Sequence, residues 1–180
     1  EGPRQTATEA AEEFVKDREL VYMSHNLSPY FSEGMKAASY EIVEVLDDGI
    51  DHVVLPVGNG SLLTGMVRGY QELLEAGIIK RIPKFHGVQA HAVRPVVAAL
   101  NGEEWSHDDV RPTNASGIAV SKPPRLKEMV EAIRATGGSG ITVSEESLTE
   151  WQVRLASSEG VFAEMTSAGA FAGLAHLIDS

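Results

Sequence analysis

Residues 52–65, HVVLPVGNGSLLTG, constrain the fold of this 180-residue chain more than any other stretch. They begin with a continuous, β-branched apolar run, residues 52–57, which is typical of a strand buried on both faces of a parallel sheet. A glycine-rich turn follows, and apolar residues then recur at helical spacing over residues 62–76 until Gly77 ends the pattern. A strand, a glycine turn and a helix in this order favour an α/β protein.

The alternation of strand and helix patterns continues along the chain. It predicts further strands at residues 19–23, 84–90 and 141–144, and further helices at residues 6–18, 36–46, 126–136, 145–157 and 166–178. Residues 101–121 show no regular pattern. We therefore expect residues 1–180 to form a single α/β domain of three layers, an open and mostly parallel sheet with helices on both faces.

Composition excludes several classes of function. No apolar run reaches the roughly 18 residues of a membrane span, so we expect no membrane partner and a cytoplasmic chain. The 15 Lys and Arg residues are scattered among 26 Asp and Glu, for a net charge of -11, so nucleic acid is not an expected partner. The absence of cysteine excludes disulfides, thiolate nucleophiles and cysteine metal sites.

Metal and hydrolase motifs are also missing. The six histidines include no HExxH motif, and His86 and His91 are five residues apart with a strand expected between them, so we expect no metal site. The pairs Ser24-His25 and Ser106-His107 lack the G-x-S-x-G elbow that exposes a nucleophilic serine. Neither chemistry is therefore favoured.

The glycine turn itself is suited to an anion. In a parallel sheet, ligands bind beyond the carboxyl ends of the strands, and glycines there let backbone N–H groups approach an anion closely. The positive end of the following helix and the hydroxyl of Ser61 add to this. The spacing of the glycines matches neither the dinucleotide motif nor a P-loop. From these residues alone, an anion site and a purely structural turn remain open.

Gly60 is the central residue of this turn. We expect it to need either a positive φ or close approach of its backbone to an anion, so that a side chain costs about 1–2 kcal/mol where φ is positive. We also expect a side chain there to occupy the space of a phosphate oxygen, and hence to impair binding more than folding.

The run VVLPVGNGSLLTGMVRGYQELLEAGIIKRIPKFHGVQA resembles the threonine synthase branch of the fold-type-II pyridoxal-phosphate enzymes, the tryptophan synthase β-like family. A proline, the glycine loop, further glycines and a GVQ segment occur in the family's order. Downstream, GIA at residues 117–119 and EGVFAEMTSA at residues 159–168 resemble two more of its motifs, and SPY, EG and YEI between residues 28 and 42 resemble the return from its small domain to its large one.

This resemblance implies a cofactor and its contacts. The cofactor is pyridoxal 5′-phosphate, and the backbone amides expected at its phosphate are those of Gly58, Asn59, Gly60, Ser61 and Leu62. Glu164 is expected near the cofactor, although Met165 stands where the family has proline. An acidic residue at a helix N-terminus also favours the helix dipole, so a structural role for Glu164 stays open.

The family holds its cofactor on a Schiff-base lysine that precedes the glycine loop, in a motif like SFKDR. Before the loop this chain has only Lys16, on the charged side of a predicted helix, and Lys36, in an ordinary EGMK context. We therefore expect no catalytic residue in this chain, with the Schiff-base lysine missing. The family's TGHGLKD segment has no counterpart either. We expect the chain to be the carboxyl-side part of the large domain, from a fragment or a naturally split protein.

The resemblance implies a lyase or synthase of amino-acid metabolism with a small amino-acid substrate. A threonine synthase is favoured, which converts O-phosphohomoserine and water to threonine and phosphate. A serine or threonine dehydratase and a cysteine synthase relative remain alternatives, and so does a non-catalytic α/β module that binds phosphate or docks on a partner. An interrupted sheet leaves an unpaired edge, so we expect a homo-oligomer or association with the missing half.

Overall fold

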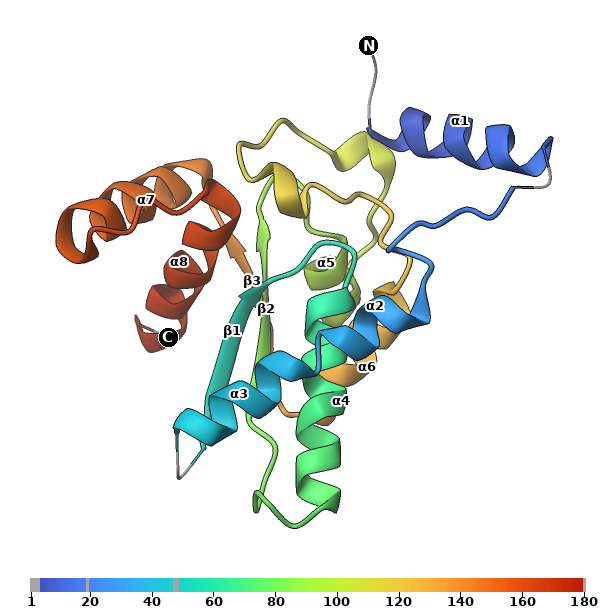
Figure 1. The fold of residues 1–180 in the computed structure, drawn as a ribbon. Helices are drawn as coiled ribbons and strands as arrows, with labels where there is room; N and C mark the ends of the chain where they lie inside the picture. Colours follow the sequence, from blue (N-terminus) through green and yellow to red (C-terminus); the bar gives the residue numbers. More distant parts are fainter. Residues whose placement is uncertain (1–3, 19, 47–48, 180) are drawn as a thin grey trace.

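The computed structural model describes residues 4–18, 20–46 and 49–179. Within these ranges the centre is a three-stranded sheet, β1 (His52–Pro56), β2 (Lys84–Ala90) and β3 (Gly140–Val143), in the order β1-β2-β3 (Figure 1). Both pairs are parallel, with His52 opposite Lys84 and Gly87 opposite Gly140. The parallel sheet predicted from the sequence is confirmed.

Helices cover both faces of the sheet (Figure 1). One face carries α4 (Ser61–Glu75), α5 (Pro95–Asn101) and α6 (Leu126–Ala135). The other carries α8 (Met165–Asp179), with α7 (Glu145–Glu159) packed against α8. The remaining helical elements are α1 (Arg4–Lys16), α2 (Pro29–Gly34), α3 (Ala37–Val45) and the short 3-10 turns η1 (His107–Asp109) and η2 (Ser116–Ile118). The three-layer α/β class is therefore confirmed.

Each face of the sheet has its own apolar core. Between the sheet and α4, the rings of Tyr70 and Phe85 are fully buried and meet edge to face, with centroids 5.7 Å apart. On the other face, Val88 packs under α8, and Gly173 allows the close approach: a Cβ on it would lie 2.4 Å from Val88 Cγ2. Burial of such side chains stabilises the fold by about 1.5–3 kcal/mol each, and it fixes α4 and α8 on opposite sides of β1.

The strand predicted at residues 19–23 is wrong where it can be assessed. Glu19 lies outside the described residues, and residues 20–23 form no strand. Val21 and Met23 are 81% and 87% exposed, so no core buries the alternating apolar side chains. The short helix α2 was not predicted; it begins with Pro29 at its first position, where proline is well tolerated.

Candidate functional site

The glycine loop begins where the pairing of β1 ends. The Val57 N–H still donates to Val88 O (2.9 Å), and the chain then turns through Gly58, Asn59 and Gly60 into α4. Gly60 is the N-cap of α4 and has φ +95°, a left-handed conformation that favours glycine. The predicted positive φ is confirmed.

The direction of a side chain at Gly60 differs from the prediction. A Cβ there would lie 2.8 Å from Cγ and Sδ of the fully buried Met129, and 3.2 Å from Cβ of Arg125. It would point into the core beneath the loop and not into the space above it. The expectation that a substitution harms binding more than folding is therefore wrong, because the first collision is with the core.

Backbone N–H groups at the start of α4 are available to a ligand. The Ser61 N–H is an exception, since it donates to Asn59 Oδ1 (3.0 Å). In the part of the chain that the structure describes, the N–H groups of Asn59, Gly60, Leu62 and Leu63 have no protein acceptor. Free amides at the positive end of a 15-residue helix form a site that attracts an anion.

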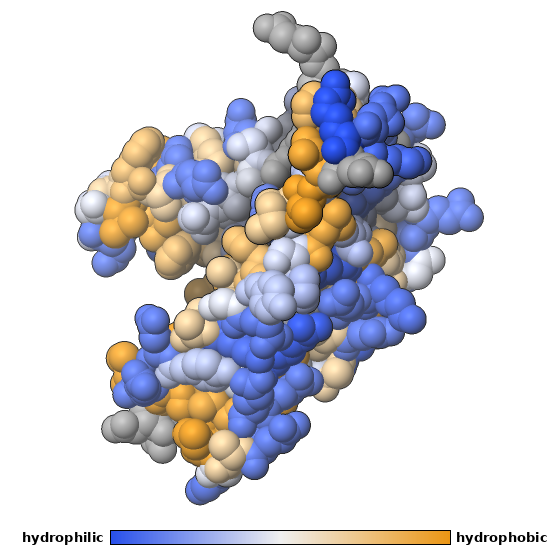
Figure 2. Space-filling model, turned by 45° about the vertical axis from the view of Figure 1, so that its right-hand side comes forward, coloured by the Kyte–Doolittle hydropathy of each residue, from blue (hydrophilic) through white to orange (hydrophobic). Residues whose placement is uncertain are grey.

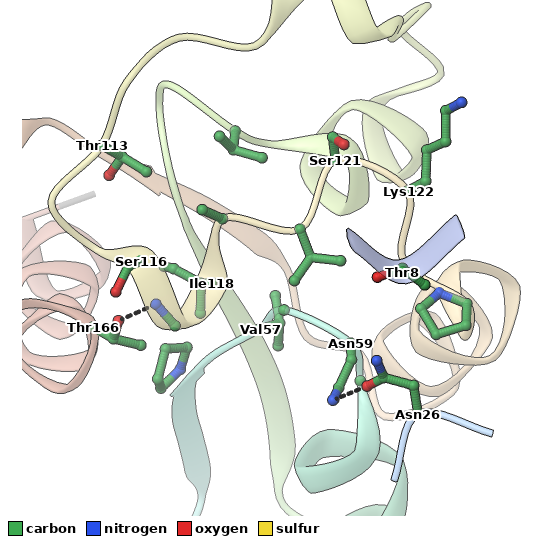
Figure 3. Close-up of a pocket in the computed structure, with 18 of the residues that line it drawn as sticks. Thr8, Asn26, Val57, Asn59, Thr113, Ser116, Ile118, Ser121, Lys122 and Thr166 are labelled. Atoms are coloured by element: carbon green, nitrogen blue, oxygen red, sulfur yellow. Dashed lines mark hydrogen bonds between the residues drawn. The ribbon is translucent and has the colours of Figure 1, made fainter. Parts of the chain in front are cut away.

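The side chain of Asn59 fixes the shape of this loop. Its Oδ1 accepts from Ser61, and its Nδ2 donates to Asn26 Oδ1 (2.7 Å), from the segment that precedes α2 (Figure 3). Thr64 Oγ1 donates back to Gly60 O (2.9 Å). The loop is thus held by side chains before any ligand binds.

A cavity of about 680 Å³ lies against the loop, within the roughly 300–1,000 Å³ of small-molecule sites. Its walls come from the glycine loop, residues 110–124, the start of α8, the segment before α2, and α1. Figure 3 shows Thr166 on one side of the cavity and Asn59 with Asn26 on the other. The amine of Lys122 is directed away from the loop in this view.

The wall opposite α4 is built on two glycines. Gly117 N–H donates to Thr166 Oγ1 (3.1 Å), and a Cβ on Gly117 would lie only 2.8 Å from that oxygen. A Cβ on Gly58 would lie 3.0 Å from Gly117 O. The GIA segment singled out in the sequence therefore packs directly between the glycine loop and α8.

Glu164 also lines the cavity, just before α8. Its backbone oxygen accepts from the Ala168 N–H (3.0 Å), and its Oε1 would lie 3.3 Å from a Cβ on Gly117. Both a contact with a ligand and a favourable interaction with the helix dipole fit this position. Its role in cofactor binding stays a prediction.

The two lysines before the loop lie outside the cavity wall. Lys36 is ion-paired with Glu33 and Glu72, and its hydrogen bonds to these carboxylates raise its pKa well above the usual lysine range. Lys16 ends α1. The lysine that does line the cavity is Lys122, which the sequence reasoning missed because nothing local distinguishes it. Among the described residues, no cluster of three or more histidines or carboxylates suited to a metal occurs.

The comparisons with known proteins decide the family. The family model described as pyridoxal-phosphate dependent enzyme matches residues 1–180. The chain belongs to this family. The cofactor of these pyridoxal-phosphate enzymes carries a phosphate group, and the free amides at α4 together with the Ser61 hydroxyl are a donor set that fits it.

Several curated relatives bear one name. The chain is 34% identical to the threonine synthase of Methanosarcina acetivorans over 165 residues, which are 90% of the chain and 41% of the relative. It is 31% identical to that of Methanocaldococcus jannaschii over 179 residues (96% and 43%), and 34% identical to that of Mycobacterium tuberculosis over 171 residues (95% and 46%). The chain thus spans less than half the length of these relatives.

Solved structures of pyridoxal-phosphate enzymes share the fold. A threonine deaminase from the organism abbreviated T.th. superposes with a TM-score of 0.78 at 20% identity, covering 97% of this chain and 56% of that one. The serine racemase from Dictyostelium discoideum gives 0.69 at 16% identity, covering 97% and 52%. At these identities the likeness concerns the fold alone. No helix among the described residues is long and apolar enough to cross a membrane.

Proposed function

We propose that this chain supplies the phosphate-binding side of a pyridoxal-phosphate site. The donors are the amides of residues 58–62, of which that of Ser61 is already paired with Asn59, together with the neighbouring amide of Leu63. The observation that carries the proposal is the coincidence of free helix N-terminal amides, a cavity of suitable size and the family's glycine loop at one place.

We propose further that the whole protein is a threonine synthase, which converts O-phosphohomoserine and water to threonine and phosphate. Support comes from curated relatives of that name at 31–34% identity over 90–96% of the chain. The threonine deaminase and serine racemase structures, at 16–20% identity, do not favour their own reactions over this one.

The chain's residues have separable roles in this proposal. Bound pyridoxal phosphate supplies an electron sink for reactions at the substrate's α-carbon. The amides at α4 anchor its phosphate, while the Gly117 to Thr166 hydrogen bond holds the facing wall at a fixed distance. Glu164 presents a carboxylate to the cavity, where it can accept a hydrogen bond from the cofactor or the substrate.

We propose that residues 1–180 are the carboxyl-side part of the large cofactor-binding domain, and that a lysine outside this chain holds the cofactor. The surface supports association with another chain or with a further part of the protein. Large apolar side chains are exposed over several elements, and Figure 2 shows them gathered in separate areas. Such areas are typical of surfaces that bind a partner or a second copy.

The test is an assay of the purified whole protein, loaded with pyridoxal phosphate, on O-phosphohomoserine, threonine and serine. Release of inorganic phosphate together with formation of threonine supports the proposal. Formation of 2-oxo acids from threonine or serine, without phosphate release from O-phosphohomoserine, would identify a dehydratase. Cofactor binding with no turnover of any of the three would favour the non-catalytic module.

A further inference from the structure

Arg125 is a buried cation directly behind the glycine loop. It is the N-cap residue of α6 and is 9% exposed. Its Nη1 donates to Asn26 O (2.6 Å) and to Ser61 Oγ (3.2 Å), and its Nη2 donates to Ser28 O (3.2 Å). One side chain thus joins α6, the first residue of α4 and the segment before α2.

The charge of this guanidinium is not compensated within the protein. Its partners are two carbonyl groups and a hydroxyl, and no carboxylate of the described residues lies within salt-bridge distance. A buried charge is unfavourable unless an opposite charge lies near it. Arg125 does not itself line the cavity, but it is one hydrogen bond away from Ser61, whose neighbouring amides are free.

The bond to Ser61 also sets the direction of the serine hydroxyl. Because Ser61 Oγ accepts from Arg125, its own proton must point away from the guanidinium and is available to another acceptor. The bonds to the backbone at residues 26 and 28 hold the segment that carries Asn26, which in turn holds Asn59. The side chains of Asn26, Asn59 and Ser61 are therefore all linked to Arg125.

We propose that Arg125 is a positioning residue of the phosphate site: it orients the Ser61 hydroxyl toward a phosphate monoester and supplies the positive charge that stabilises the bound anion. The inference rests on the proposed function, since it assigns Arg125 to the same phosphate site. It extends that proposal by adding a side chain that lies outside the glycine loop and outside the family motifs quoted above.

The test compares binding of pyridoxal 5′-phosphate, inorganic phosphate and pyridoxal, which lacks the phosphate, to the whole protein by calorimetry. Arg125→Met is expected to weaken binding of the two phosphate-bearing probes by about tenfold or more, while binding of pyridoxal changes less than about twofold. Arg134→Met is the matched control: Arg134 lies on the same helix and also donates to backbone carbonyls, those of Ala99 and Leu100. It is expected to change none of the three.

Ser61→Ala tests whether Arg125 acts through the hydroxyl. The double variant is expected to lose less affinity for phosphate than the product of the two single losses, because both remove the same interaction. If Arg125→Met fails to fold, Arg125→Lys replaces it; this variant keeps the charge without the fork and is expected to retain part of the phosphate affinity.

The outcomes separate the two proposals. Failure of the wild-type protein to bind either phosphate-bearing probe would refute the proposed function. Binding by the wild type with unchanged phosphate affinity in Arg125→Met or Arg125→Lys would overturn only the role of Arg125. Equal losses for pyridoxal and pyridoxal phosphate would also overturn it, because they indicate a general distortion of the cavity.

Discussion

Replacement of Gly60 by alanine should reduce the free energy of unfolding by about 2–5 kcal/mol, the sum of two costs. Adoption of φ +95° by a residue with a Cβ costs about 1–2 kcal/mol. The new Cβ would also lie 2.8 Å from the buried Met129, and an overpacked core costs about 1–3 kcal/mol more. Gly77, just beyond the other end of α4, separates the two contributions: it has φ +72° with no atom within 4 Å of a Cβ, so Gly77→Ala should cost only about 1–2 kcal/mol.

Both variants are compared with the wild type by urea unfolding of the whole protein without cofactor, with the free energies extrapolated to water. The larger loss in Gly60→Ala measures the collision with Met129. Equal losses in the two variants would show that Met129 yields freely and that the loop is not packed on the core as described. No loss at Gly60 would refute the left-handed turn itself.

Three other predictions concern the surroundings of the loop. Gln89→Leu should lower the free energy of unfolding by about 1–3 kcal/mol in a denaturation assay, because the buried N–H groups of Val96 and Val97 lose their acceptor; an unchanged stability would contradict this. Burial, aided by the nearby His52 and Lys84, lowers the pKa of His86, so the unfolded chain binds the proton more readily. Stability should fall as the pH drops below about 6.5, the ordinary histidine value, and His86→Asn should flatten this dependence in melts at several pH values; an equally steep fall would count against it. Lys36, with its raised pKa, should stay unmodified when the protein is treated with pyridoxal phosphate and borohydride, and a Lys36 adduct by peptide mass spectrometry would refute that expectation.

The elements that local pattern governs could be predicted from the sequence. The buried run before the loop forms β1, the helical spacing after it forms α4, and the need for a left-handed glycine placed the turn at Gly60. The same logic failed at residues 20–23, because alternation of apolar residues indicates a strand only where another strand is available to pair with it.

The rest of the site depends on contacts between residues far apart in the chain. Arg125 bonds to residues 64, 97 and 99 positions away, and no periodicity or motif marks such a residue. The wall at residues 110–124 lacks regular structure apart from η2, so its place at the cavity follows from packing of Gly117 against Gly58 and Thr166. These glycines were visible in the sequence, but their shared neighbour was not.

The crystal structure of the whole protein with pyridoxal phosphate bound tests the central claim most directly. The account predicts that the phosphate oxygens accept hydrogen bonds from the N–H groups of Asn59, Gly60 and Leu62, within about 3.2 Å, and from the hydroxyl of Ser61. The cavity also carries two basic side chains on residues 110–124, Arg111 and Lys122. A phosphate bound to these side chains, with the amides at the start of α4 left without it, would contradict the account.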